Sequence, residues 1–327
     1  MIISKTPYRI SFFGGGTDYP CWYKENRGQV LTTSINKYCY ISCRPLPPFF
    51  DHKFRVLYSK SETVRKISEI QHPSARACLQ FMGIKEGLEI HYDGDLPARS
   101  GLGSSSAFTV GLLNVLHALK GHVVSPEQLT ADAIHVEQDM LRENVGSQDQ
   151  VIAAHGGCNI ISFGDRNHLQ VRPLTVSLAR LEELQSCLML FYTGIVRTAS
   201  DIAGAQIKKT PMRKKELSAM YDMVDRAVEI LDGKADISEF GRLLHENWLI
   251  KRSLTDKITS PVIDQMYAAA MKSGALGGKI LGAGGGGFML VFAEPKAQPK
   301  IRAALKKLLH VPFKFEHSGS SIIFYRP

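Results

Sequence analysis

The sequence predicts an α+β fold made of two parts. Segments in which apolar and polar residues alternate, as in strands, are mixed with segments whose apolar residues have the spacing of a helix. Residues from about 200 to 275 have a helical pattern throughout. The chain has 327 residues, of which 44% are hydrophobic, so it can form two domains and bury a sizeable core. We place the boundary between about residues 165 and 187 and divide the chain into 1–175 and 176–327.

The predicted strands are short runs rich in β-branched and aromatic residues. They cover residues 1–13, 37–45, 54–59, 88–93, 158–162 and 188–193, a strand, glycine loop and strand over 279–293, and the terminal SIIFYR.

Three helices outside the 200–275 stretch have clear signals. Residues 104–121 form a long apolar run that follows three serines. In the next helix, 125–141, Ser125 can be the N-cap and Gln128 completes a capping box. A basic amphipathic helix is expected over 296–309.

The composition narrows the class of protein. A formal net charge of +9 suits a nucleic acid, a membrane surface or a phosphorylated small molecule. The densest basic run, Lys208–Leu217, is interpreted as a solvated surface, and no RNA-binding aromatic motif accompanies it. No apolar run reaches the roughly 18 residues of a membrane span, and we see no signal peptide. Six scattered cysteines without a CxxC pair favour a reducing cytoplasm, so we expect a cytoplasmic protein without membrane or nucleic-acid partners.

The run PARSGLGSSSAF, residues 97–108, predicts a phosphate site. The first N–H groups of a helix lack partners and carry a partial positive charge, and glycines let a ligand approach the backbone. One serine would suffice for a helix cap, so three in a row favour phosphate binding. A Walker loop is excluded because no lysine follows the glycines. The residues assigned to this site are Arg99, Gly101, Leu102, Gly103, Ser104, Ser105 and Ser106.

A second glycine run, GAGGGG, formally matches the dinucleotide-binding pattern at Gly282, Gly284 and Gly287. That pattern should open a helix, yet a strand-like segment follows, so the dinucleotide interpretation fails. A glycine turn with its backbone close to a ligand is favoured over a simple bulged hairpin.

Three acidic residues are candidates for chemistry. Asp18 follows a glycine turn after a strand, where a simple local cap is the favoured interpretation. Glu137 lies on an apolar helix face, where it needs a metal, an arginine or a donor network unless it is partly exposed. Together with Asp149 it could supply a Mg²⁺ ligand and an acceptor for a hydroxyl proton, as phosphoryl transfer requires.

The three glycine motifs, in this order, resemble those of the GHMP kinases, the family of galactokinase, homoserine kinase, mevalonate kinase and phosphomevalonate kinase. The resemblance covers YRISFFGGGTDY, PARSGLGSSSA and KILGAGGGGFML and so spans nearly the whole chain. It implies a ribosomal-protein-like β-α-β domain, 1–175, and a ferredoxin-like domain, 176–327, with the active site between them. It also implies ATP and Mg²⁺ as cofactors, with the serine loop around the ATP phosphates.

The resemblance also implies roles for single residues. Ser106 and Glu137 match the family's Mg²⁺ ligands, and Asp149 matches the aspartate that faces the acceptor hydroxyl. Arg9 matches a cation that supports Asp149, so Asp149 and Arg9 are the expected catalytic residues. The residues expected to bind the acceptor are Arg9, Gly15, Gly16, Thr17, Asp18, Asp149, Gly284, Gly285 and Arg197.

One departure from galactokinase concerns the acceptor. Gly15 and Gly16 stand where galactokinase has a Glu-His pair, so they empty that space and offer backbone N–H groups to an anionic tail. The stretch SFFGGGTDYP is similar to the bacterial D-glycero-D-manno-heptose 7-phosphate kinases. This similarity implies phosphorylation of the anomeric O1 to a 1,7-bisphosphate for surface-glycan synthesis, by a monomer or homodimer. Arg197 and Lys208 are candidates for the substrate phosphate, with plain surface charge as the alternative.

Three other functions stay open at this point. One is a different sugar-1-kinase, such as a fucokinase or a galactokinase-like enzyme, which would act on an unphosphorylated sugar. Another is a non-catalytic sensor that binds ATP and sugar on the same fold. The third is a basic RNA-binding module, which would bind RNA in a salt-dependent way.

Overall fold

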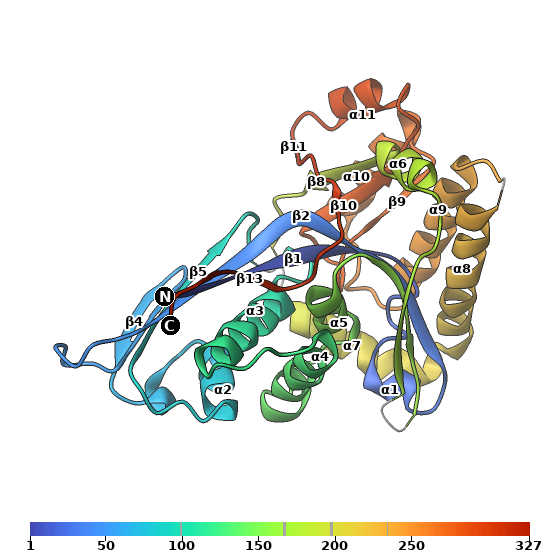
Figure 1. Ribbon diagram of the computed structural model, residues 1–327. Coiled ribbons are helices and arrows are strands. Elements are labelled where there is room, and N and C mark those ends of the chain that lie inside the picture. Colours follow the sequence, from blue (N-terminus) through green and yellow to red (C-terminus); the bar gives the residue numbers. More distant parts are fainter. Residues whose placement is uncertain (99, 166–167, 197–198, 234) are drawn as a thin grey trace.

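A large sheet built from both ends of the chain forms the framework of the molecule (Figure 1). The structure, a computed structural model, describes residues 1–327 except 99, 166–167, 197–198 and 234. The strands of this sheet in the described part of the chain are β1 (Ile2–Phe13), β2 (Gly28–Pro45), β3 (Phe54–Leu57), β4 (Ser61–Val64), β5 (Leu88–Gly94), β6 (Cys158–Phe163), β7 (Leu169–Pro173), β12 (Phe315–Glu316) and β13 (Ser321–Tyr325).

Strand β2 organises the large sheet. Its 18 residues pair with β1 along one edge, and with β5, β6 and β12 over successive stretches. The order β13-β1-β2-β5-β3-β4 is antiparallel except between β3 and β5. The C-terminal strand β13 therefore lies beside the N-terminal strand β1.

Helices cover one face of the large sheet (Figure 1). They are α2 (Pro73–Phe81), α3 (Ser104–Leu119), α4 (Pro126–Ile134) and α5 (Gln148–His155). Helix α3 packs against β1 and β2 and is buried on nearly every side, which explains its continuous apolar sequence. Its N-terminus is therefore fixed rigidly over the large sheet.

The second part of the chain contains a small antiparallel sheet in the order β11-β8-β10-β9. Its elements, with the short N-terminal helix, are α1 (Pro20–Tyr23), α6 (Leu178–Ser186), β8 (Leu188–Tyr192), α7 (Ala199–Lys209), α8 (Lys214–Asp232), α9 (Ser238–Ser253), α10 (Pro261–Lys272), β9 (Gly277–Ile280), β10 (Phe288–Phe292), α11 (Gln298–Ala304) and β11 (Leu309–His310). Helix α9 packs on β9, and α8 packs on β1 and β2. The two parts of the chain thus share an extensive contact.

Most predicted elements are confirmed with shifted bounds. The strand predicted over 37–45 begins at Gly28, and the helix predicted over 296–309 ends at Ala304. Ser125 caps α4 by accepting from the Gln128 N–H, but the Gln128 side chain does not complete the capping box; its amide donates to Asp132. The division at residue 175 stays a prediction, and the strand pairing adds that β12 and β13 belong to the large sheet.

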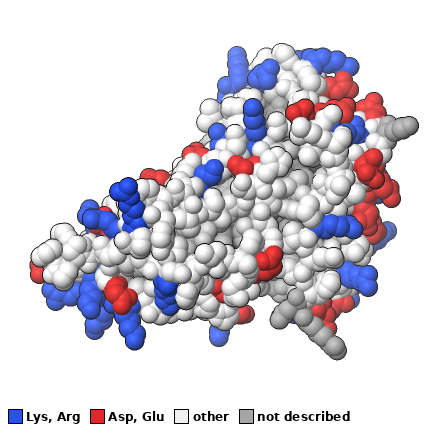
Figure 2. All heavy atoms as spheres, viewed as in Figure 1, with Lys and Arg blue, Asp and Glu red and all other residues white. Residues whose placement is uncertain are grey.

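The surface and the cysteines add little that points to a macromolecular partner. Figure 2 shows acidic and basic side chains interspersed over this face, with Lys and Arg more frequent at the end near β4. All six cysteines are free thiols. None of the helices in the described residues is both long and apolar enough to cross a bilayer.

Candidate active site

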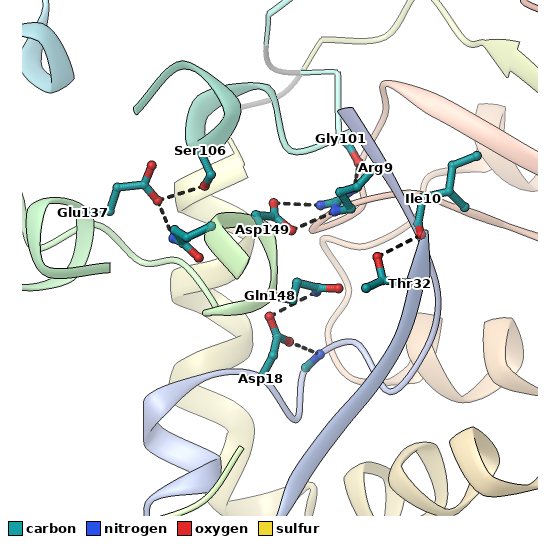
Figure 3. Close-up of polar contacts among 12 residues, drawn as sticks. Arg9, Ile10, Asp18, Thr32, Gly101, Ser106, Glu137, Gln148 and Asp149 are labelled. Atoms are coloured by element: carbon teal, nitrogen blue, oxygen red, sulfur yellow. Dashed lines mark hydrogen bonds and ion pairs between the residues drawn. The ribbon is translucent and has the colours of Figure 1, made fainter. Parts of the chain in front are cut away.

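Arg9 and Asp149 form the centre of the candidate site (Figure 3). Arg9 Nε donates to Asp149 Oδ1 at 2.7 Å and Nη2 donates to Oδ2 at 2.8 Å, a two-point ion pair that fixes the carboxylate plane. The third guanidinium nitrogen, Nη1, donates to the carbonyl of Gly101 at 2.7 Å. Arg9 therefore joins strand β1, the serine loop and helix α5 at one point.

The serine loop has the geometry of an anion site. Gly103 is the N-cap of α3 with φ of 77°, and as a glycine it has no side chain to cap the helix. The first N–H groups of α3 have no partner within the helix, which is the arrangement that binds anions at helix N-termini. Leu102 is fully buried and its carbonyl accepts from Arg9 N at 3.1 Å, whereas Ser105 is exposed. Leu102 anchors the loop and Ser105 can face a ligand.

The second glycine run lies against the serine loop. The Gly282 φ is +67°, and a Cβ there would lie 2.7 Å from the Cα of Gly101. A Cβ at Gly287 would lie 2.2 Å from the Ser100 carbonyl oxygen, and Phe288 N donates to that oxygen at 3.1 Å. The glycines therefore permit two backbones to touch, which confirms the expected strand, glycine loop and strand.

Gly284 and Gly285, expected to bind the acceptor, pack on Ile258. Gly285 N donates to the Ile258 carbonyl at 2.8 Å, and a Cβ at Gly284 would lie 2.9 Å from the same oxygen. The Gly285 N–H is therefore already used within the protein. Their role in binding a ligand stays a prediction.

Glu137 lies in a π-helical turn, η2 (His135–Met140), at the end of α4. Such turns occur often at functional sites. Glu137 is fully buried, which excludes the partly exposed position that the sequence left open, and burial raises the pKa of its carboxyl to about 7. Its Oε2 accepts from Ser106 Oγ at 2.9 Å and from the Gln150 amide.

The Glu137 site fits a magnesium ion. Among the described residues, the second carboxylate oxygen, Oε1, is buried and accepts no hydrogen bond, while the Ser106 hydroxyl is bonded to the other oxygen, Oε2. Mg²⁺ prefers oxygen ligands and often takes one or two protein ligands, with phosphate oxygens and waters completing the shell. Among the described residues no cluster of three or more His, Cys, Asp or Glu forms a metal site. Ser106 and Glu137 thus suit a metal that arrives with a phosphate ligand.

Asp18 is buried rather than a simple surface cap. Its Oδ1 accepts from Gly16 N at 2.8 Å and its Oδ2 accepts from Gln148 Nε2 at 3.0 Å (Figure 3). Burial is the main cause that raises the pKa of its carboxyl, and the charge of Asp149 adds to the rise. The two carboxylates are thus close enough to interact. Thr17 is also fully buried, and its hydroxyl bonds the Gly14 and Gln29 carbonyls.

The two glycines at 15 and 16 differ in what they leave free. The Gly16 N–H donates to Asp18, so it is not available to an anionic tail. Gly15 has room for a methyl group: a Cβ there would make ordinary van der Waals contacts with Ser11 Oγ at 3.7 Å and Gln148 Nε2 at 3.9 Å, with nothing nearer. Among the described residues, Ser11 Oγ and Gln148 Oε1 are buried oxygens without a hydrogen-bond partner. The surroundings of Gly15 are therefore neutral and polar.

The other basic residues expected near a phosphate group are Arg99, for ATP, and Arg197 and Lys208, for the substrate. Arg99 and Arg197 lie outside the described residues. Lys208 is exposed on α7, whereas Gln206 of the same helix is buried and lies against Gly16. The helix therefore presents an amide rather than an ammonium group to the glycine turn.

Two buried lysines near the site escaped the sequence analysis. Lys251 of α9 and Lys279 of β9 are 5% and 1% exposed. Their signal was present, because each stands in an apolar run, NWLIKR and GGKILG. A lysine in such a run is usually paired or functional when buried.

Comparison with known proteins identifies the family. The family model described as GHMP kinases N terminal domain matches residues 68–157, and the one described as GHMP kinases C terminal matches residues 227–311. Together the two matches cover more than half of the chain. The chain belongs to the GHMP kinase family. It is a phosphotransferase related to sugar kinases, and a kinase of this family uses ATP.

Individual relatives of this GHMP kinase are sugar kinases. D-glycero-alpha-D-manno-heptose 7-phosphate kinase of Campylobacter jejuni is 28% identical over 94% of this chain and 93% of its own length. The bifunctional fucokinase/GDP-fucose pyrophosphorylase of Arabidopsis thaliana is 24% identical over 90% of this chain, which spans only 30% of that protein. The crystal structure of a D-glycero-D-manno-heptose 1-phosphate kinase from Bacteroides thetaiotaomicron has a TM-score of 0.81, 22% identity and full coverage of both chains. This last likeness supports the α+β GHMP kinase fold.

Proposed function

We propose that this GHMP kinase transfers the γ-phosphoryl group of ATP to the anomeric O1 of D-glycero-D-manno-heptose 7-phosphate. The product would be the 1,7-bisphosphate, a precursor for nucleotide sugars of bacterial surface glycans. The observation that carries the phosphoryl transfer is the Arg9–Asp149 ion pair beside the uncapped N-terminus of α3. The similarity over nearly the full length of a heptose 7-phosphate kinase supports the choice of acceptor.

In this mechanism Asp149 orients the anomeric hydroxyl and accepts its proton. The Asp149 side chain is 25% exposed, and Arg9 holds its plane, so the carboxylate can meet an acceptor without a large rearrangement. An anomeric hydroxyl is more acidic than an ordinary alcohol, so this step does not require a strong base. Positioning thus supplies most of the rate enhancement.

Helix α3 and the serine loop would bind the phosphate donor, ATP. The N–H groups at the start of α3 would neutralise charge on the ATP phosphates as it shifts toward the leaving oxygen. Ser106 and Glu137 would hold Mg²⁺, which supplies positive charge to the phosphates when bound. Arg9 adds a cation between donor and acceptor.

A second candidate acceptor is an unphosphorylated sugar. Gly15 lies beside Ser11 Oγ and the Gln148 amide, and that amide donates a hydrogen bond to the Asp18 carboxylate. Neutral oxygens and a carboxylate suit sugar hydroxyls better than a phosphate. The fucokinase relative is consistent with this alternative. On the first proposal, the substrate phosphate would therefore lie away from Gly15.

The experiment is an ADP-release assay with Mg-ATP across several acceptors. The panel contains heptose 7-phosphate, mannose 6-phosphate, free heptose, fucose, galactose and mevalonate. Turnover of the phosphorylated sugars alone supports the first proposal, and turnover of a free sugar supports the second. ATP binding without turnover of any sugar would favour an untested acceptor or a non-catalytic sensor.

A substitution at Gly15 tests where the acceptor binds. Gly15 has no positive φ, and a Cβ there meets nothing closer than 3.7 Å, so Gly15→Ala should fold as stably as the parent protein. If the acceptor lies against Gly15, the variant should raise the KM for the acceptor about tenfold and leave the KM for ATP unchanged. Equal KM values for the acceptor would show that it lies elsewhere.

A further inference from the structure

Lys251 and Lys279 are buried basic residues that have no carboxylate partner in the described part of the chain. Lys251 Nζ donates to the carbonyls of Ile280 at 3.2 Å and Gly282 at 2.5 Å. Lys279 Nζ donates to the carbonyl of Phe12 at 2.7 Å. Within the described residues neither ammonium group forms an ion pair with a carboxylate. Carbonyl dipoles compensate a buried charge only in part, so both groups are costly to bury in the absence of an anion.

Lys251 is connected to the serine loop through the backbone of one residue, Gly282. The Gly282 carbonyl that it binds belongs to the glycine turn, residues 282–287, whose backbone lies against Gly101. Gly101 in turn accepts the Arg9 Nη1 hydrogen bond. A short path of backbone contacts thus runs from the ammonium group to the Arg9–Asp149 pair.

Basic and acidic groups both act on Lys251. Arg9 and Lys279 are the basic neighbours, and Asp18 and Asp149 are the acidic ones. Burial is the main cause that lowers the pKa of Lys251 to about 7, and the charges of Arg9, Asp18 and Asp149 also act on it. Asp149 is already paired with Arg9. An anion bound at the neighbouring loop would therefore favour the protonated, positively charged form of Lys251.

We infer that Lys251 is a positioning residue for phosphoryl transfer. Its ammonium group holds the glycine turn against the serine loop, and the phosphates of bound ATP compensate its buried charge. The inference rests on the proposed phosphoryl transfer from ATP, but not on the identity of the acceptor. The inference gives helix α9 a role in nucleotide binding, although α9 lies outside the three glycine motifs. It also explains why a lysine, rather than an apolar residue, occupies this position.

The test compares two variants that differ in what they retain. Lys251→Met removes both the charge and the donor, and Lys251→Gln removes the charge but keeps an N–H donor. The probe is Mg²⁺ with AMPPNP, a non-hydrolysable ATP analogue, and no acceptor is added. Thermal unfolding is measured with and without the probe. Lys306→Met serves as control, because it removes an exposed positive charge far along the sequence from the turn.

The expected result separates a charge effect from a purely structural contact. Without nucleotide, Lys251→Gln should unfold at the parent's temperature or above it, because a buried charge is gone. The rise in unfolding temperature that AMPPNP causes should fall to less than half of the parent's value in both variants. Lys306→Met should keep the full rise. In the sugar assay, kcat should fall about 10- to 100-fold with the KM for the acceptor unchanged.

Two results would overturn the inference. If both variants are less stable without nucleotide but keep the full AMPPNP effect, Lys251 only fastens the turn. If neither variant folds, Lys251 is needed for the fold itself. Because no acceptor is present, an incorrect choice of sugar does not affect these measurements. A parent protein that AMPPNP fails to stabilise would contradict ATP use, and the proposed function with it.

Discussion

The Arg9 guanidinium holds both carboxylate oxygens of Asp149, at 2.7 Å and 2.8 Å. The arginine side chain is 5% exposed, whereas the aspartate side chain is 25% exposed. The Arg9 side of the pair is therefore buried, whereas the Asp149 side is accessible to a ligand. A carboxylate held in this way can approach a ligand with its orientation already set.

Replacing Asp149 should separate catalysis from folding. Asp149→Asn keeps the size of the side chain and loses its charge and basicity. We expect kcat to fall at least about 100-fold, as is typical when a positioned base is removed. ADP release at saturating acceptor measures this loss, and an unchanged unfolding temperature shows that the fold is intact. A variant with nearly full turnover would mean that Asp149 is not the acceptor's base.

Replacing Glu137 should affect magnesium rather than stability. Glu137→Gln removes a buried carboxylate whose ionisation is already disfavoured, so the ligand-free protein should not lose stability. The Mg²⁺ concentration that gives half-maximal activity should rise at least about tenfold, since a carboxylate ligand is lost. Glu143→Gln is the control, because Glu143 is the neighbouring carboxylate outside the proposed site. Equal Mg²⁺ dependence of Glu137→Gln and the control would remove Glu137 as a ligand.

The contact between the two glycine motifs can be tested with a matched pair of substitutions. Gly282 and Gly121 both have positive φ, so alanine at either position carries a similar backbone penalty. A Cβ at Gly121 meets nothing within 4 Å, whereas one at Gly282 lies 2.7 Å from the Cα of Gly101. Gly282→Ala should therefore lose about 1–3 kcal/mol more than Gly121→Ala on denaturant unfolding. It should also raise the KM for ATP, which Gly121→Ala should not do.

The buried lysines predict how stability changes with pH. The pKa of Lys251 is lowered from 10.5 to about 7, chiefly by burial, while Arg9, Asp18, Asp149 and Lys279 surround it. Between these two values the unfolded chain binds more protons than the folded one, so the free energy of unfolding rises with pH. Lys251→Met should weaken this rise, and Lys279 should retain a share of it. Urea unfolding from about pH 7 to 9.5 measures both slopes, and identical slopes would contradict the lowered pKa.

Much of the site could be predicted because its signals are local. Three serines after glycines predict a helix N-terminus that binds anions, and α3 begins at Ser104 without a side-chain cap. The position of Glu137 on an apolar helix face indicates either a buried, partnered carboxylate or a partly exposed one, and Glu137 is fully buried. Such features depend on spacing along a single element, so the sequence carries them directly.

Other parts of the site could not be predicted from local pattern. Asp18 alone indicates a local cap, yet its second oxygen is bonded by Gln148 from a helix far along the chain. The Gly16 N–H was expected to face a ligand and instead bonds Asp18. These outcomes depend on which segments meet in the fold, and a turn motif does not contain that information.

By itself, the sequence determined the family, the order of most elements and the residues that we propose for the chemistry. The tertiary structure decided which groups are free to act. Folding brings Arg9 to Asp149 and packs the glycine turn against the serine loop. It also buries Lys251, whose ammonium group bonds the turn. The reason is physical: a side chain's charge, partners and exposure are set by neighbours that are distant in sequence, and only packing selects those neighbours.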